Sequence, residues 1–281
     1  MKLLRVGPPG AETPALLAPD STIRDLSAHV RDIDGDALSP AGLAKLSAID
    51  PANCPIIEGA SRIGPCVVRP LNFVCIGLNY ADHANEAGMA IPKEPIVFLK
   101  SLSAFCGPFD DVHMPPGAEK VDWEVELGIV IGTKARCVPE ERSMEHVAGY
   151  CVINDVSERA YQAERGGTWD KGKGCDTFGP TGPWMVTRDE VADPQSLDLW
   201  CDVDGQRMQH GNTRTMIFGV RHLVSYVSQF ITLYPGDLIA TGTPPGVGLG
   251  KKPEPIFLRA GQVMQAGVQG LGEQRQLLVA S

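Results

Sequence analysis

The stretch that decides how this chain folds is Val121-Asp122-Trp123-Glu124-Val125-Glu126-Leu127-Gly128-Ile129-Val130-Ile131. Its first half alternates apolar and acidic residues, and its second half is apolar apart from Gly128, a pattern typical of a strand that enters a protein core. On such a strand Glu124 and Glu126 share one face with Asp122, and neighbouring carboxylates lie roughly 7 Å apart. We therefore predict a strand over 121–131 that carries closely spaced carboxylates.

Two interpretations of this acidic face are open. It can be the solvated side of an amphipathic strand, or its carboxylates can share a cation that offsets their repulsion. A third acid, Asp155, ends the apolar run Val152-Ile153-Asn154-Asp155, and a carboxylate at the end of a buried strand usually has a partner. This favours a hard divalent cation with oxygen ligands, with Mg²⁺, Mn²⁺ and Ca²⁺ as candidates.

Composition excludes several classes of function. The chain has 281 residues, is 43% hydrophobic and carries a formal net charge of −9 without a basic block, which argues against nucleic acids and anionic membranes as partners. No apolar run approaches the roughly 18 residues that span a bilayer, and Gly7-Pro8-Pro9-Gly10 interrupts any signal peptide. Eight cysteines without a Cys-x-x-Cys pair indicate buried free thiols. We expect a cytoplasmic enzyme.

Short β-type runs and abundant turn residues predict a mainly β protein with some α (α+β) and long functional loops. Residues 1–68 are predicted to form a small N-terminal domain and residues 69–281 the larger domain, with Pro65 and Pro70 at the boundary. Strands are expected at 3–6, 15–17, 73–77, 96–100, 150–154, 199–203, 206–209, 237–241 and 263–268, the Asp204-Gly205 pair forming a hairpin turn. Helices are expected at 39–47, 79–88 (helix or turn), up to about 164 after Asp155, and 217–230.

Six segments carry a resemblance to a known family. They are Cys75-Ile76-Gly77-Leu78-Asn79-Tyr80-Ala81-Asp82-His83-Ala84-Asn85-Glu86, Pro95-Ile96-Val97-Phe98-Leu99-Lys100, Asp122-Trp123-Glu124-Val125-Glu126-Leu127-Gly128, Asn154-Asp155-Val156-Ser157-Glu158-Arg159, Gly172-Lys173-Gly174-Cys175-Asp176-Thr177-Phe178-Gly179-Pro180 and Thr241-Gly242-Thr243-Pro244-Pro245-Gly246-Val247-Gly248. Together, and in this order, they resemble the fumarylacetoacetate hydrolase family from about residue 72 to 277.

The resemblance implies a fold, a metal site and a substrate class. It implies a mixed β-sandwich roll with a smaller N-terminal domain, paired as a homodimer. It also implies that Glu124, Glu126 and Asp155 hold the divalent cation, with Mg²⁺ the first choice, and that the substrate is a small 2-oxo acid.

His83 and Glu86 are three residues apart on an expected short helix, so they share one face. They can be a surface histidine with an incidental neighbour, or an imidazole whose tautomer and basicity are set by a carboxylate, which suits a general base. The resemblance favours the second interpretation, because the matching pair of the family is implicated in activating water.

Lys173 lies between glycines in Gly172-Lys173-Gly174, where it can be a solvated lysine or, as the resemblance implies, an ammonium that faces a substrate oxygen. The family commonly has Ser at the position of Gly174, so this loop departs from the pattern. Substrate-binding roles are implied for Arg159, Gln162 and Thr243. Trp169 and Phe178 either line the pocket or pack.

These residues favour hydrolysis of a C–C bond in a 2,4-diketo acid of the acylpyruvate type, with release of pyruvate. The segments 248–253 and 270–276 are similar to a branch of the family that contains 2,4-diketo-3-deoxy-L-fuconate hydrolases and proteins labelled ureidoglycolate lyase, so a 2,4-diketo-3-deoxy sugar acid is one version of the substrate. The alternatives are decarboxylation of oxaloacetate, hydration or isomerisation of a 2-oxo acid on the same scaffold, and a non-enzymatic binding protein.

Overall fold

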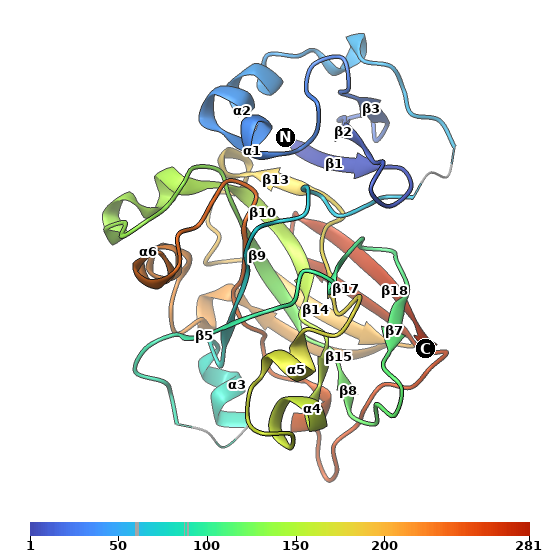
Figure 1. The fold of residues 1–281 in the computed structure, drawn as a ribbon, viewed down its shortest axis with the longest axis vertical. Coiled ribbons are helices and arrows are strands. Elements are labelled where there is room, and N and C mark those ends of the chain that lie inside the picture. The colour runs from blue at the N-terminus through green and yellow to red at the C-terminus, as the bar shows by residue number, and fades with distance from the viewer. Residues whose placement is uncertain (60–61, 87, 89) are drawn as a thin grey trace.

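Two β-sheets packed against each other form the body of the protein (Figure 1). The computed structural model describes residues 1–59, 62–86, 88 and 90–281. In the first sheet the order is β3 (Ile23–Asp25), β2 (Thr13–Leu17), β1 (Lys2–Val6), β13 (Met185–Thr187), β10 (Val147–Asn154), β9 (Val125–Ile131), β16 (Leu238–Ala240), β4 (Phe73–Gly77) and β5 (Ile96–Leu99). In the second it is β15 (Gln206–Asn212), β14 (Asp198–Val203), β17 (Val263–Val268), β18 (Gly272–Ala280) and β7 (Val112–Met114).

Short elements complete the described part of the chain. Two further strand pairs join β11 (Ser157–Glu158) to β8 (Val121–Asp122) and β12 (Gly179–Pro180) to β6 (Phe105–Cys106). The α-helices are α1 (Gly35–Leu38), α2 (Pro40–Ser47), α3 (Ala81–Glu86), α4 (Arg159–Ala163), α5 (Asp170–Lys173) and α6 (Val220–Phe230). The 3₁₀ turns are η1 (Pro51–Asn53), η2 (Glu140–His146), η3 (Arg188–Glu190), η4 (Thr213–Thr215) and η5 (Gly248–Gly250). The prediction of a mainly β protein with some α is confirmed.

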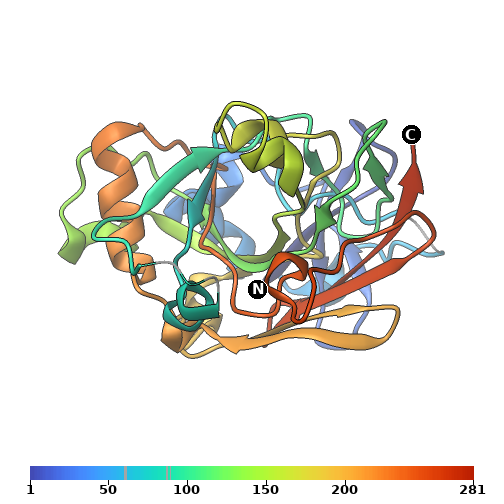
Figure 2. The ribbon, with the colours of Figure 1, turned by 90° about the horizontal axis from the view of Figure 1, so that it is seen from below.

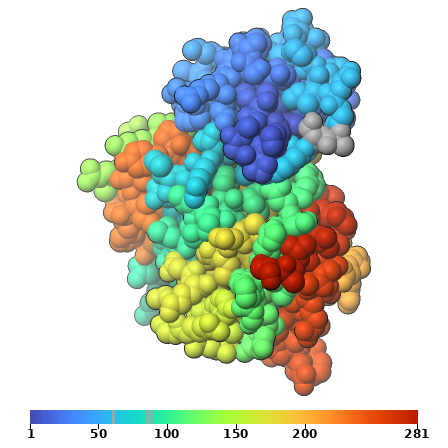
Figure 3. Space-filling model, turned by 45° about the vertical axis from the view of Figure 1, so that its right-hand side comes forward, coloured from blue at the N-terminus to red at the C-terminus, as the bar shows by residue number. Residues whose placement is uncertain are grey.

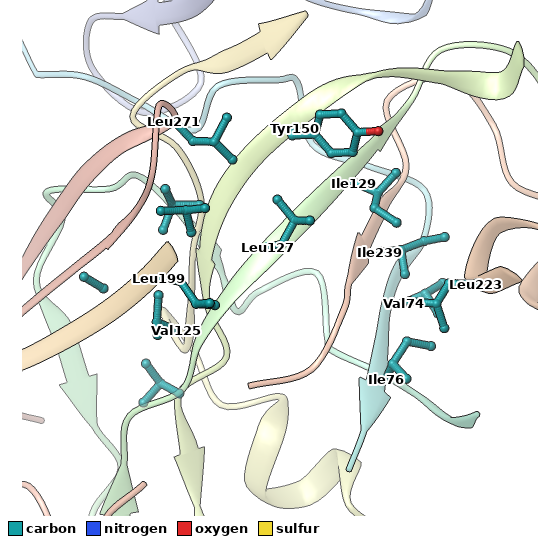
Figure 4. Packing of buried hydrophobic residues seen from close by; sticks show 14 of the residues in the cluster. Val74, Ile76, Val125, Leu127, Ile129, Tyr150, Leu199, Leu223, Ile239 and Leu271 are labelled. Atoms are coloured by element: carbon teal, nitrogen blue, oxygen red, sulfur yellow. The ribbon is translucent and has the colours of Figure 1, made fainter. Parts of the chain in front are cut away.

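Strand β9 is the centre of the packing. Val125, Leu127 and Ile129 point to one side, where they join one apolar cluster with Leu199 of the second sheet and Leu223 of α6 (Figure 4). The other face of β9 presents Glu126, then Gly128, where a Cβ would lie only 2.6 Å from Ile153 Cδ1. The strand is therefore buried on both faces, as its apolar second half predicts.

Two features of the predicted strand over 121–131 are wrong. It is interrupted at Trp123 and Glu124, because Asp122 turns its carboxylate to the Trp123 N–H (2.9 Å) and the Glu124 N–H is taken by Asn154 Oδ1 (3.1 Å). The first piece, β8, pairs with β11 instead of β10. The solvated-face interpretation is also wrong, since Asp122, Glu124 and Glu126 are all buried.

The helices depart from the predictions at their ends. The predicted helix 217–230 begins only at Val220, because the N–H groups of Ile217 and Phe218 are bound by the backbone and side-chain oxygens of Asn79 (both 2.8 Å). The predicted segment 79–88 contains α3, and its Ala87 lies outside the described residues. Lys173, predicted to lie in a loop, is the last residue of the short helix α5.

The N-terminal segment lies at one end of the molecule, at the top in Figures 1 and 3. Its strand β1 pairs with β13 through Lys2↔Val186 and Leu3↔Met185, so it extends the larger sheet. The domain boundary at 68/69 stays a prediction. All eight cysteines are free thiols. Among the described residues no helix is both long and apolar enough to cross a membrane.

Candidate active site

Three carboxylates meet at the ends of β9 and β10. Glu126 is in register with Ile153, and the Asp155 N–H donates to the Glu124 carbonyl oxygen (2.9 Å), so the pairing of the two strands brings all three acids together. One oxygen from each of Glu124, Glu126 and Asp155 lies within 4.8 Å of the others, and all three residues are buried. A donor set made only of carboxylate oxygens fits a hard divalent cation.

Buried cations surround two of these acids. Lys173 Nζ lies 2.5 Å from Glu124 Oε2 and 2.8 Å from Asp155 Oδ2. Burial alone would raise the pKa of Glu124, but the charges of Lys173 and Arg159 outweigh it and lower the pKa to about 2. Burial would likewise lower the pKa of Lys173, but Asp155 and Glu124 outweigh it and raise this pKa. Lys173 is therefore a buried ammonium, and its interpretation as a solvated lysine is wrong.

Glu126 is different from the other two acids. Its Oε2 accepts a hydrogen bond from the Gly242 N–H (2.8 Å), and no side-chain cation pairs with it among the described residues. Burial, followed by repulsion from Asp155 and Glu124, raises the pKa of Glu126 well above its usual range. A bound cation would relieve this repulsion, because it would add positive charge where the carboxylates converge.

Lys100 is a further charged residue of the site, and no motif in the sequence predicts its role. Its ammonium is fully buried, forms an ion pair with Asp155 Oδ1 and donates to the Val156 carbonyl oxygen (3.0 Å). Lys173 binds the other oxygen of Asp155, so each oxygen of this carboxylate has its own cation. The only sequence signal was a lysine at the end of the apolar run 96–99, where a charge needs a partner.

We predict that Lys100→Met destabilises the protein, because it leaves Oδ1 of the buried Asp155 without its cation, while Lys173 still binds Oδ2. The free energy of unfolding should fall by about 3–5 kcal/mol, measured by urea denaturation. Lys93→Met, which removes an exposed lysine on the segment before β5, is the control and should change stability little. A loss for Lys100→Met as small as that of the control would contradict this role.

Arg159 joins the carboxylate triad to a neighbouring loop. Its Nη2 lies 2.7 Å from Glu124 Oε1, its Nε donates to Asp122 Oδ2 (2.8 Å) and its Nη1 donates to Gln162 Oε1 (3.1 Å). Asp122 also accepts the N–H groups of Gly248 (2.6 Å) and Leu249 (2.9 Å). Asp122 thus faces Arg159 and this loop, which explains why it is absent from the carboxylate triad.

His83 and Glu86 come together on α3 as their spacing predicts. His83 Nδ1 lies 3.3 Å from Glu86 Oε2. Glu86 is held in turn by the Gly246 N–H, 3.0 Å from Oε2 and 3.2 Å from Oε1. With Nδ1 directed at the carboxylate, Nε2 is the ring nitrogen left to accept a proton.

These groups line one cavity of about 400 Å³. Figure 2 shows α3 and the α4–α5 pair on separate sides of this end of the molecule. The polar residues of the wall are His83, Glu86, Glu124, Glu126, Arg159, Gln162, Lys173, Thr243 and Lys252. The rest of the wall is Ile76, Gly77, Leu78, Phe98, Ala163, Trp169, Val247, Leu249 and Gly250. Every predicted site residue except Asp155 therefore lines this cavity, and Asp155 contacts Lys173, which lines it.

The side chains predicted to bind the substrate differ in whether their polar atoms already have hydrogen-bond partners in the protein. Thr243 Oγ1 donates to the Val125 carbonyl oxygen (2.9 Å) and accepts from Gln209 Nε2 (2.7 Å), so its hydroxyl is already engaged. Gln162 uses Oε1 for Arg159, and within the described part of the chain its amide NH₂ has no protein acceptor. Trp169 lines the cavity, whereas Phe178 packs in the core.

Gly174 does not line the cavity. A Cβ at this position would lie 2.8 Å from the Asp170 carbonyl oxygen and 3.1 Å from Ser101 Cβ, so a side chain there would require the backbone to shift. The nearby Gly172 has no room for a side chain at all, since a Cβ there would lie 2.3 Å from the Glu158 carbonyl oxygen. The close approach of α5 to the 158–162 segment thus depends on Gly172, while the departure at Gly174 lies away from the site.

Comparisons with known proteins agree on one family. Residues 72–279 match the family model described as fumarylacetoacetate (FAA) hydrolase C-terminal. A Burkholderia multivorans protein named "Putative hydrolase" is 63% identical over 281 residues, covering 100% of both chains. The structure is similar to a fumarylacetoacetate hydrolase from Exiguobacterium antarcticum, with a TM-score of 0.89, 33% identity and full coverage of both chains. It is also similar to a maleylpyruvate hydrolase from Sphingobium sp. SYK-6, solved with manganese(II) and pyruvate, with a TM-score of 0.82, 28% identity and full coverage of both.

Proposed function

The chain belongs to the fumarylacetoacetate hydrolase family, and from this premise we propose that it is a divalent-cation-dependent hydrolase of acylpyruvate-type 2,4-diketo acids. One observation carries the proposal. The carboxylate triad, the Lys173 ammonium and the His83–Glu86 pair all belong to one buried site beside one cavity. A cation site, an anion-stabilising group and a base are the parts that hydrolytic cleavage beside a 2-oxo acid needs.

The head of the substrate would bind at the triad. Glu124, Glu126 and Asp155 would hold the cation, with Mg²⁺ as the first candidate and Mn²⁺ or Ca²⁺ as alternatives. When bound, the cation supplies a Lewis acid that polarises the keto group next to the substrate's carboxylate. Gln162, with its amide NH₂ free, would donate to that carboxylate beside Arg159, and Thr243 would border it.

The bond-breaking steps use His83 and Lys173. His83 takes a proton from water at Nε2 while the water oxygen bonds to the distal carbonyl carbon, and Glu86 stabilises the imidazolium. The bond from this carbon to the methylene group then breaks, and its electron pair passes to the methylene carbon, which yields the enolate of pyruvate and a carboxylic acid. Lys173 stabilises the negative oxygen of the enolate until water protonates the methylene carbon, which gives the methyl of pyruvate, and the hydroxide left behind takes the proton held by His83.

The second candidate function uses the same enolate but changes a different bond of the substrate. Decarboxylation of oxaloacetate, and hydration or isomerisation of a 2-oxo acid, use the cation and Lys173 without attack by water on a distal carbonyl. The contact between His83 and Glu86 favours hydrolysis over decarboxylation, since loss of CO₂ from oxaloacetate needs no base to activate water. A homodimer and a cytoplasmic location remain predictions from the sequence.

A substrate panel tests the proposal. Purified protein with Mg²⁺ is given acetylpyruvate, a 2,4-diketo-3-deoxy sugar acid or oxaloacetate, and pyruvate release is measured with and without EDTA. We expect cation-dependent release of pyruvate from the diketo acids, faster than from oxaloacetate. Turnover of oxaloacetate alone would replace hydrolysis by decarboxylation, and a protein that bound no divalent cation would support a non-enzymatic role.

A further inference from the structure

A second cavity adjoins the active-site cavity. It has a volume of about 330 Å³, and four residues border both spaces: Arg159, Gln162, Ala163 and Leu249. Its remaining wall comes from Lys120, Glu164, Glu254, Pro255 and Phe257. The proposed chemistry uses Arg159 and Gln162 of this wall for the substrate's carboxylate and none of its other seven residues, so the space is available for a part of the substrate that lies beyond the reacting carbons.

Leu249 borders both cavities, and hydrogen bonds hold the backbone of its turn. Asp122 fixes the N–H groups of Gly248 and Leu249, and the Ile256 N–H donates to the Gly248 carbonyl oxygen (3.0 Å). A Cβ on Gly248 would lie 2.0 Å from the Ile256 carbonyl oxygen, so the two segments run in direct contact. The backbone of Leu249 is thereby tied to a buried acid two residues before the cation ligand Glu124.

The η5 turn also lies beside Glu86, the carboxylate that is proposed to orient the base His83. A Cβ on Gly250 would lie 2.9 Å from Glu86 Oε2, and Glu86 contacts His83. A substrate chain that continues past the carbonyl attacked at His83 would therefore meet Leu249 next. Leu249 also lines the second cavity.

The walls of the second cavity suit an apolar group. Ala163, Leu249, Pro255 and Phe257 supply apolar surface, and the Lys120 ammonium is already paired with Glu164. Arg159 is paired with Asp122 and Glu124, so no unpaired cation faces this space from the residues that the structure describes. Glu254, which has no ion-pair partner among the described residues, would repel a terminal carboxylate, and the hydroxyls of a sugar tail would lose hydrogen bonds with water at an apolar wall.

We propose that the second cavity receives an apolar acyl tail of the substrate and that Leu249, at the passage between the cavities, sets the tail length. This inference rests on the proposed function, since it names the substrate class of the same site. The favoured substrates are acylpyruvates with straight alkyl tails, in preference to sugar-derived or carboxylate-ended ones.

The test compares acetylpyruvate with straight-chain acylpyruvates of increasing length. Burial of one methylene group contributes about 0.8 kcal/mol, so kcat/KM should rise about three- to fourfold per added carbon until the cavity is filled. In Leu249→Trp the ratio of long-chain to acetyl kcat/KM should fall, and in Leu249→Ala longer chains should be accepted. Ile256→Ala is the matched control, because Ile256 has the same exposure (50% against 49%) in the facing segment but borders neither cavity. This control should keep the wild-type ratio.

A binding series separates this inference from the proposed function. Straight-chain 2-oxo acids have the chelating head and the tail but no bond that hydrolysis can cleave, so their affinity for the Mg²⁺-loaded protein is measured by calorimetry. If no acylpyruvate is cleaved but affinity rises with tail length and falls in Leu249→Trp, the hydrolase proposal fails and the tail site stands. If neither kcat/KM nor affinity depends on tail length, or if Leu249→Trp changes neither profile, the tail site is overturned.

Discussion

Replacing Glu126 with Gln is expected to abolish both divalent-cation binding and hydrolytic activity. Among the three carboxylates Glu126 is the informative one, because Glu124 and Asp155 also hold Lys173, Arg159 and Lys100 in place. A Gln at 126 keeps an oxygen that can accept the Gly242 N–H, so the change removes one negative charge with little effect on the ion pairs. The loss of cation affinity should exceed the roughly 10–100-fold that changes in outer partners of a metal site cause.

Cation binding to Glu126→Gln can be measured without an activity assay. Mg²⁺ should raise the Tm of the wild-type protein, because a ligand that binds only the folded state stabilises it. In Glu126→Gln the Tm without cation should be unchanged or higher, since repulsion among buried carboxylates is relieved, and Mg²⁺ should no longer shift it. Glu164→Gln, which alters an exposed carboxylate, is the control and should respond like wild type. A full Mg²⁺ shift in Glu126→Gln would remove Glu126 from the ligand set.

The sequence predicted the elements that follow simple periodicity. Strands such as β4, β14 and β17 and the helix α6 have apolar residues at regular spacing, and all are present near the predicted bounds. Strand β18 was missed because two of its inward positions carry Gln274 and Gln276, which disguise the pattern. Both side chains are buried, and their amide NH₂ groups donate to backbone oxygens; Gln274 Nε2, for example, donates to the Val152 carbonyl oxygen (2.7 Å). A buried glutamine is stable only when its polar atoms are hydrogen-bonded, and here the partners are distant along the chain, so local sequence does not reveal them.

The candidate site could be predicted where residue types alone imply chemistry. The three acids, the His83–Glu86 spacing and Lys173 were selected from motifs, and the fold brings them to one place. Lys100 and Leu249 were not selected, because a single lysine or leucine has no pattern and its role comes from what it faces. The break between β8 and β9 could not be predicted either, since Asp122 fits the alternation of apolar and acidic residues but its carboxylate binds Arg159 and the η5 turn.

Replacing His83 with Ala is expected to lower kcat for acylpyruvate hydrolysis by about 10²- to 10⁴-fold, the usual contribution of a general base. Affinity for Mg²⁺ should be retained, because the oxygens that converge belong to Glu124, Glu126 and Asp155. The partner test is Glu86→Gln, which keeps a hydrogen-bonding group near the imidazole but removes its charge. We expect a smaller loss from this variant, measured as pyruvate release under the same conditions.

A second readout distinguishes a base from a residue that merely supports the fold. Exchange of the methyl protons of pyruvate for deuterium passes through the enolate, which in our mechanism depends on the cation and Lys173 but not on activation of water by His83. His83→Ala should therefore keep this exchange while it loses hydrolysis, and His113→Ala, which removes an exposed histidine on β7, should keep both. If hydrolysis, exchange and Mg²⁺ affinity fell together in His83→Ala, His83 would hold the site in shape. The enolate chemistry and the attack of water would then have no separate residues, and the preference for hydrolysis over decarboxylation would lose its basis.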